Sequence, residues 1–288
     1  MIIAAVAAGV LLGAVYGILA LGFNLSVGVV RILNFAHGAV VVWSMYAILV
    51  LSQALGVHPY LIAPLVLIGA FVFGYVSQRF LVERILDQSE ESQVLFGLGM
   101  LFVLMHGLQM AFGHESRVAK TPGLDGSVPF FDGRLLVGLV VGGAIAVVAC
   151  LAVAFVLRRS NLGRKLRASA NNREGARLIG LPVAHLNAVA AGVSAVLAAV
   201  AGICLVPIIV LRPELSMQYT LLALVIVIIG GLGNLLGSLV GGLLVGVITV
   251  VGLQYLSGTL TDALLYLLVF VFLLWKPLGL LGSKVGAK

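Results

Sequence analysis

The polar residues best suited to a specific function interrupt the apolar sequence at two places. Residues 28–38 contain Arg, Asn, His and two Gly, and residues 230–238 contain one Asn among four glycines. Polar groups at membrane depth are costly and usually face protein or a water-filled path. The two stretches therefore predict helix breaks of the kind that line solute routes in transporters. The candidate residues are Asn34, Phe35, His37, Gly38, Gly230, Gly231, Gly233, Asn234 and Gly237.

The first stretch suggests particular roles. Asn34 is expected to cap a helix that begins near Phe35, and Gly38 would let another backbone approach. For His37 the alternatives are a gating or solute-binding role and a hydrogen bond to a neighbouring backbone carbonyl. No second His, Cys or carboxylate lies within one helical turn of it, so a metal site is not indicated. The chain also lacks a convincing nucleophile and base pair, which disfavours an intramembrane enzyme.

A basic stretch at residues 158–177 is the second kind of candidate site. It holds seven of the 17 Lys and Arg residues, and it lies between long segments without any charged side chain. Under the positive-inside rule it is a cytoplasmic loop, and it has no interleaved aromatics that would stack on nucleic acid bases. Residues 164–181 are expected to form a short helix on that face. Its apolar surface for a partner's groove would be Ala168, Ala176, Leu178 and Ile179.

The amino-acid composition indicates that these sites belong to a membrane protein. The chain is 62% hydrophobic and 9% charged, whereas soluble domains carry about 25% charged residues. The uncharged blocks are continuously apolar, which indicates helices, because barrel strands alternate apolar and polar residues. We therefore predict an all-α, polytopic membrane bundle that forms a single domain over residues 1–288, with a cytoplasmic loop at 158–185.

Nine spans are predicted, with eight to ten as the range, because the glycine-rich junction at 230–237 suggests a broken or re-entrant crossing. Counting from the basic loop places Arg31, Arg79, Arg84, Lys276, Lys284 and Lys288 inside, and the loop 114–134 outside. The predicted spans lie near 3–25, 37–55, 60–78, 94–113, 135–157, 186–210, 219–233, 236–256 and 261–275.

Glycines four residues apart indicate close helix packing, which bundles use whatever their function. The pairs are Gly13/Gly17, Gly233/Gly237, Gly237/Gly241 and Gly242/Gly246. Asn24 is one of several polar residues at depth, and a hydrogen bond between helices is the favoured expectation for it.

Several motifs resemble those of the H-type permease subunit of the branched-chain amino acid (Liv) ABC importers. The amino-terminal signature of that family is similar to residues 13–22 (GAVYGILALG) followed by residues 34–38 (NFAHG). Residues 163–168 (GRKLRA), with Ala176, Gly180 and Leu181, look like its cytoplasmic coupling loop. Residues 230–233 (GGLG), with Gly237, Gly241 and Gly242, resemble its glycine block, and residues 276–280 (KPLGL) resemble its closing motif.

The resemblance implies an ABC-importer permease fold in a bacterial inner (plasma) membrane. Implied partners are a second homologous permease, two cytoplasmic ATPase subunits, an extracytoplasmic solute-binding protein and membrane lipid. No phosphate-binding loop occurs in the sequence, so this chain is expected to be no enzyme and to bind no cofactor, with ATP and magnesium held by the ATPases. The residues expected to couple to the ATPases are Arg164, Lys165, Arg167, Ala168, Glu174, Ala176, Arg177 and Gly180.

The expected solute is a branched-chain amino acid or a related small polar solute. Urea, amides and aromatic acids remain alternatives, because similar permeases serve them. A stand-alone secondary transporter is a further alternative that the helix breaks allow, although the scarcity of intramembrane carboxylates disfavours it.

Overall fold

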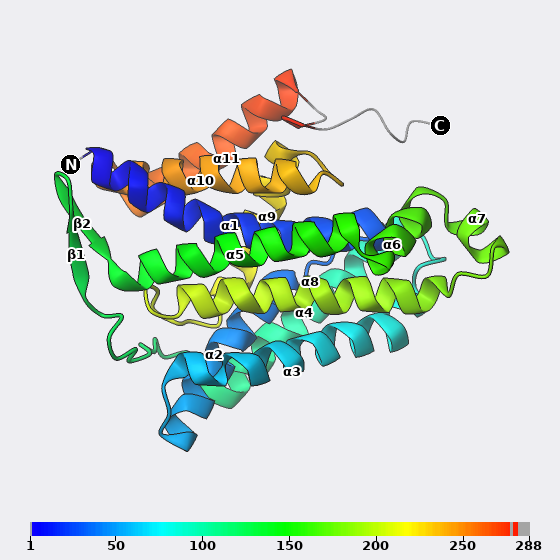
Figure 1. Ribbon diagram of the computed structural model, residues 1–288, viewed down its shortest axis with the longest axis horizontal. Coiled ribbons are helices and arrows are strands. Elements are labelled where there is room, and N and C mark those ends of the chain that lie inside the picture. Colours follow the sequence, from blue (N-terminus) through cyan, green and yellow to red (C-terminus); the bar gives the residue numbers. More distant parts are fainter. Residues whose placement is uncertain (1, 277–278, 282–288) are drawn as a thin grey trace.

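Long apolar helices dominate the computed structural model, which describes residues 2–276 and 279–281 (Figure 1). Eight helices in the described part are long and apolar enough to cross a membrane, and one further apolar helix is shorter. The protein is therefore a polytopic helical membrane protein. These nine helices are α1 (Ile2–Val30), α2 (His37–Leu55), α3 (Pro59–Phe80), α4 (Glu90–Phe112), α5 (Val137–Arg159), α8 (Val183–Leu205), α9 (Leu215–Gly230), α10 (Leu235–Tyr255) and α11 (Gly258–Trp275).

The remaining elements are short and connect these helices. They are η1 (Val82–Arg84), β1 (Ser127–Phe130), β2 (Gly133–Leu136), α6 (Asn161–Asn171) and α7 (Arg173–Leu178). The predicted positions of the spans are confirmed to within a few residues for most helices. The predicted span at 135–157 starts too early, since Leu135 and Leu136 end an antiparallel hairpin before α5 begins.

The helix α9 is shorter than the eight long helices, and it ends at the glycine-rich junction where a broken or re-entrant crossing is predicted. Its 16 residues extend about 24 Å at 1.5 Å per residue, less than the roughly 30 Å hydrocarbon core. It is joined to α10 by only four residues, 231–234. Gly230 and Gly237 face each other there, and a Cβ atom on either would overlap the carbonyl group of the other. The tight junction therefore depends on glycine at both positions.

The centre of the bundle is made by α1 and α8, which carry long runs of buried residues. Glycines let α10 approach α1 along its length. A Cβ atom at Gly13 would lie 2.7 Å from the Cα of Leu243, and one at Gly9 would lie 2.6 Å from the Cα of Val247. Gly242 and Gly246 pack directly on the backbone of Gly17 and Gly13. The predicted packing role of glycines four apart is confirmed for α1 and α10.

The molecule has two distinct ends (Figure 1). One end, which we call the basic face, carries η1, α6 and α7. Arg31 donates to the carbonyl of Ala170 in α6 at 2.7 Å, and Arg173 of α7 pairs with Glu83 of η1 at 3.3 Å. The prediction that Arg31 and the segment around Arg84 share a face with the basic stretch is thus confirmed.

The opposite end, the hairpin face, contains β1 and β2 beside the start of α1 (Figure 1). The backbone N–H of Ala4 donates to Asp132 at 3.1 Å, and Arg117 forms a bridge with Leu211. The loops at 113–126 and 206–214 therefore lie on one face, as the count of spans predicts. The predicted positions of Pro277, Leu278, Lys284 and Lys288 lie outside the described residues.

Candidate functional site

The first break comprises residues 31–36, between α1 and α2. Arg31 has φ +63°, a left-handed conformation that costs a non-glycine residue roughly 1 kcal/mol. Its N–H still bonds to the carbonyl of Val27 at 3.0 Å, so the turn closes the end of α1. Its side chain then bonds to Ala170. The break is therefore joined directly to α6.

The prediction that Asn34 caps a helix beginning near Phe35 is wrong. The helix α2 begins at His37, and its N-cap residue, Ala36, makes no capping bond through a side chain. The Asn34 Oδ1 accepts from the N–H of Ala36 at 3.1 Å, two residues ahead. Asn residues commonly form such local turns. Asn34 therefore shapes the turn before the helix, and its Nδ2 takes no part in this hydrogen bond.

His37 is buried and serves the packing of the bundle. Its Nε2 donates to the carbonyl of Leu19 at 3.0 Å, and its ring lies edge-on to Phe23 with centroids 5.6 Å apart. Of the two alternatives for His37, the hydrogen bond to a neighbouring carbonyl is the one observed. Within the described residues, no group of three or more His, Cys, Asp or Glu side chains could hold a metal ion.

The helix α9 supports the first break through Thr220. The Thr220 Oγ1 donates to the carbonyl of Phe35 at 2.8 Å and accepts from the N–H of Gly38 at 3.1 Å. A Cβ atom on Gly38 would overlap the backbone of Ser216 and Thr220. The predicted approach of another backbone at Gly38 is confirmed, and the approaching backbone belongs to α9.

The second break comprises residues 231–234, between α9 and α10, and the Asn side chains in and around it are fully hydrogen-bonded. Asn24 of α1 reaches into it: Oδ1 accepts from Gly233 N–H at 2.6 Å, while Nδ2 donates to Asn234 O at 2.9 Å and Ser238 Oγ at 2.7 Å. Asn234 caps α10 by accepting from Leu236 N–H at 3.0 Å and from the next N–H at 3.1 Å. The second break is therefore a structural joint held by the amide groups of Asn24 and Asn234.

The segment 279–281 completes this joint. Leu280 N–H donates to Ile229 O at 2.8 Å, and Asn234 Nδ2 donates to the carbonyl of Leu281 at 2.6 Å. Gly279 has φ +84°, and a Cβ atom there would lie 2.5 Å from Gly231. The described part of the closing motif thus packs on the glycine block, although the two are about 50 positions apart in the sequence.

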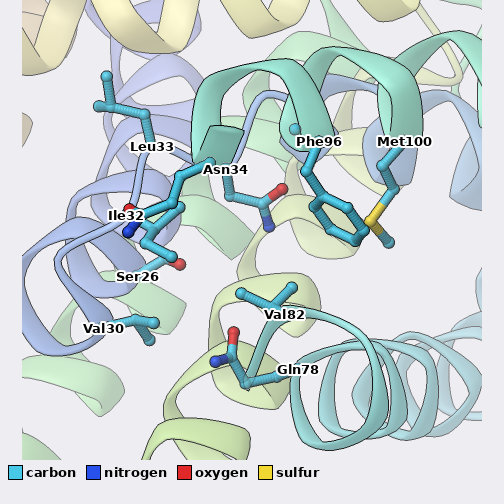
Figure 2. A pocket seen from close by; sticks show the side chains of 11 residues that line it. Ser26, Val30, Ile32, Leu33, Asn34, Gln78, Val82, Phe96 and Met100 are labelled. Atoms are coloured by element: carbon cyan, nitrogen blue, oxygen red, sulfur yellow. The ribbon is translucent and has the colours of Figure 1, made fainter. Parts of the chain in front are cut away.

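A pocket opens beside the first break, between the end of α1, the end of α3 and the start of α4 (Figure 2). Its cavity volume of about 20 Å³ holds one water, so no solute fits in this conformation. Amide side chains from three elements line it: Asn34 from the break, Gln78 from α3 and Gln93 from α4. The other lining residues are Ser26, Val30, Ile32, Leu33, Val82, Phe96, Gly97 and Met100.

The basic stretch forms two helices, so the prediction of one short helix over 164–181 is wrong. Asn172 separates them because its Oδ1 accepts from Gly175 N–H at 2.8 Å and caps α7. In α6, Gly163, Leu166 and Ser169 form the buried side. Gly180 has φ +80° and ends α7, while Leu181 N–H bonds back to Ala176 O at 3.0 Å. The two helices lie at one end of the bundle (Figure 1).

The expected coupling residues are exposed with one exception. Ala176 is 3% exposed, so the expectation that its side chain belongs to an apolar outer surface is wrong. Leu178 and Ile179 are instead 88% and 75% exposed. Arg167 is exposed but donates to the Leu157 carbonyl at the end of α5. The remaining exposed members are Arg164, Lys165, Ala168, Glu174, Arg177 and Gly180.

Sequence reasoning missed three residues that organise the site: Gln78, Thr220 and Glu83. Glu83 accepts from Arg173 at 3.3 Å and from Asn187 Nδ2 at 3.4 Å, which ties η1 to α7 and α8. Gln78 and Thr220 are polar residues inside uncharged blocks, and that position was the available signal.

A bundle of eight long apolar helices and one shorter one in the described residues, with two irregular segments between helices, defines a polytopic helical membrane protein. The chain belongs to the family described as branched-chain amino acid transport system, permease component, which matches residues 5–274. It is therefore a transport component that works with other subunits, and it is a multi-pass protein of the bacterial inner membrane.

Named relatives cover nearly the whole chain. It is 28% identical over 289 residues to the high-affinity branched-chain amino acid transport system permease protein LivH of Salmonella typhimurium, covering 95% of this chain and 93% of that protein. LivH of Escherichia coli K12 is 27% identical with the same coverage. BraD of Pseudomonas aeruginosa is 25% identical, over 95% of this chain and 94% of BraD. No solved structure is significantly similar to the chain.

Proposed function

We propose that the chain is the permease subunit of an ATP-driven importer that moves branched-chain amino acids, or a closely related small polar solute, into the cell. The single observation that carries this proposal is the family match over residues 5–274. The relatives LivH and BraD are named as permeases for branched-chain amino acids. The chain itself performs no covalent chemistry and binds no cofactor.

The complete importer would contain a second homologous permease, two cytoplasmic ATPases that hold ATP and magnesium, and an extracytoplasmic solute-binding protein. The basic face is the cytoplasmic side, because it carries the residues 158–177 and basic loops favour the cytoplasm. The hairpin face then meets the binding protein. Exposed side chains of α6 and α7, with Leu178 and Ile179 at the tip, form the docking surface for an ATPase.

The mechanism is a change between outward- and inward-facing arrangements driven by the ATPases. Two side-chain contacts join the docking surface to the pocket. Arg31 links the first break to Ala170 of α6, and Glu83 of η1, which follows α3, pairs with Arg173 of α7. A shift of α6 and α7 would therefore move two walls of the pocket, the first break and the end of α3.

The experiment is an acidic substitution at the exposed apolar tip of the docking surface. Leu178→Glu and Ile179→Glu should each lower solute-stimulated ATP hydrolysis about ten-fold, because burying one apolar contact at an interface is worth roughly 1.4 kcal/mol or more. Gln88→Glu is the matched control, since it adds the same charge at an exposed position of the basic face outside α6 and α7 and should change little. Wild-type hydrolysis and uptake in both tip variants would contradict the docking assignment.

The solute is tested separately through the binding protein that copurifies with the importer. A ligand that binds only the folded protein raises its melting temperature by mass action. Leucine, isoleucine and valine should raise it, whereas urea and benzoate should not. A shift with urea or benzoate and none with leucine would overturn the proposed solute.

A further inference from the structure

Three cavities adjoin one another along α2, α3 and α4. The pocket at the first break shares Asn34, Gln78 and Met100 with a second cavity of about 20 Å³. That second cavity shares Val40 and Phe73 with a third, which has a volume of about 380 Å³. Together they run from Leu51 of α2 and Leu65 of α3 to Val82 of η1, which lies on the basic face.

The two ends of this line differ in chemistry. The large cavity is lined mainly by apolar side chains such as Trp43, Leu51 and Leu65, and Ser44 adds a hydroxyl group. The two small cavities add amides and hydroxyls, including Asn34, Ser77 and Gln78. The line is wide and apolar toward the hairpin face and narrow and polar toward the basic face.

Gln78 is the residue that points to a ligand. It is 3% exposed, and its Nε2 has no hydrogen-bond partner among the described residues. Unpaired buried amides are rare, because a buried donor without an acceptor is costly. Gln78 lines both small cavities, and Figure 2 shows its amide directed into the first of them.

Asn34 faces Gln78 from the opposite wall (Figure 2). Its Oδ1 is held by the N–H of Ala36, which leaves the Nδ2 donors turned into the pocket. Gln93 adds a third amide, although its Nε2 is already bonded to the carbonyls of Leu86 and Gln88 at 3.1 and 3.0 Å. The narrow part of the line therefore offers uncommitted amide groups on two facing walls.

The lining carries no Asp, Glu, Lys or Arg in any of the three cavities. His37 lines the middle cavity, and its Nε2 is committed to the carbonyl of Leu19. A solute with a net charge would lose hydration here without meeting a counter-charge. A net-neutral solute with both donors and acceptors would bond to the amides, and an aliphatic group would occupy the apolar cavity.

We propose that Gln78 and Asn34 bind the polar end of the solute in a transport route along α2, α3 and α4, and that this route selects net-neutral solutes with an aliphatic side chain. This inference rests on the permease function proposed above and names the residues that contact the solute. The cavity at Gln78 and Asn34 is the closed constriction of the route, and its opening requires α3 and the first break to separate.

The test uses the complete importer in proteoliposomes, with leucine as solute. Gln78→Leu keeps the size of the side chain and removes the amide, so leucine uptake should fall about ten-fold or more, as expected for a lost hydrogen bond to a charged group. Its melting temperature should be equal or higher, because the amide has no partner to lose. Gln78→Asn should restore part of the uptake.

The matched control is Gln254→Leu, an identical substitution at an exposed position of α10, which should leave leucine uptake unchanged. Uptake by Gln78→Leu within about two-fold of wild type would overturn the inference, because one lost hydrogen bond to a charged group predicts a larger fall. So would a lower melting temperature with a proportional loss of uptake, which is the signature of a structural residue.

A second measurement separates this inference from the proposed function. Gln78→Cys should react with a charged, water-soluble methanethiosulfonate during ATP turnover, because only a hydrated thiolate reacts. Cys150 and Cys204 are buried and give little background. One outcome is that wild type takes up no leucine while Gln78→Cys still reacts with the reagent. In that case the proposed solute would be wrong, and the route along α2, α3 and α4 would still hold. If Gln78→Cys stayed inert in an importer that transports leucine, the route would fail.

Discussion

The two helix breaks look alike in the sequence and differ in the structure. Each is a short irregular segment between two apolar helices, and each contains an Asn. In the second break, the side-chain amides of Asn24 and Asn234 are hydrogen-bonded to backbone groups of the joint. In the first break, Asn34 keeps its Nδ2 for the pocket, where Gln78 also lacks a partner. A saturated break serves the fold, whereas an unsaturated break is suited to a ligand.

The largest expected effect comes from adding a methyl group to the second break. Gly230→Ala places a Cβ atom on the Gly237 carbonyl, and overpacking of this kind costs about 3 kcal/mol. The protein should fail to accumulate in the membrane, as measured by fluorescence of a carboxy-terminal fusion.

The control is Gly28→Ala, near the end of α1. Its Cβ atom would meet Gly233 at an ordinary 3.7 Å, and Ala is favoured over Gly in a helix by about 1 kcal/mol. Membrane levels should therefore equal wild type. Equal losses for both variants would show that the overlap between Gly230 and Gly237 is not what limits accumulation.

The next effect is removal of the side chain that fills the second break. Asn24→Leu leaves the Gly233 N–H without its acceptor and removes one of the donors to the Asn234 carbonyl, at a cost of about 2 kcal/mol. The melting temperature in detergent should fall clearly. A melting temperature within error of wild type would mean that the bonds of Asn24 contribute nothing net.

A smaller loss of stability is expected from the cap of α10. Asn234→Ala removes a capping side chain, which typically costs about 1 kcal/mol. Asn34→Ala removes one local turn bond and should cost less. The melting temperature of Asn234→Ala should therefore be lower than that of Asn34→Ala. The reverse order would contradict the contrast between a saturated and an unsaturated break.

The smallest expected effect on stability concerns the link between the first break and α6. Arg31→Gln removes the bond to Ala170 at an exposed site, which should change stability by less than about 1 kcal/mol. Solute-stimulated ATP hydrolysis should fall more than basal hydrolysis, because the link transmits movement from α6. A proportional change in both rates would remove Arg31 from the proposed connection.

Much of the fold follows from local patterns that the sequence shows directly. The uncharged blocks predict the helices, and glycines four apart in α1 and α10 predict their close contact, as Gly13 and Gly246 demonstrate. The glycine junction predicts an irregularity between two spans, and the structure places a four-residue connection there. The hairpin was missed because Leu135 and Leu136 are as apolar as the helix that follows. The division of α6 from α7 depends on one cap, Asn172.

The difference between the breaks could not be predicted, because it depends on partners distant in sequence. Asn24 is 209 positions from Gly233, and Thr220 is 185 positions from Phe35. An Asn pattern shows a polar group at depth, but only the assembled bundle shows whether that group has a partner. Gln78 carries no local signal beyond its place in an apolar span. Residues that remain unpaired after folding are therefore visible only in the structure.

The most direct test of the account compares leucine uptake by Asn34→Ala and Asn234→Ala, each normalised to the amount of folded importer. We predict that Asn34→Ala lowers kcat/KM about ten-fold with its melting temperature nearly preserved, while Asn234→Ala keeps kcat/KM and melts at a lower temperature. If both variants lost uptake only in proportion to folded protein, both breaks would be structural, and the proposed route at the first break would be wrong.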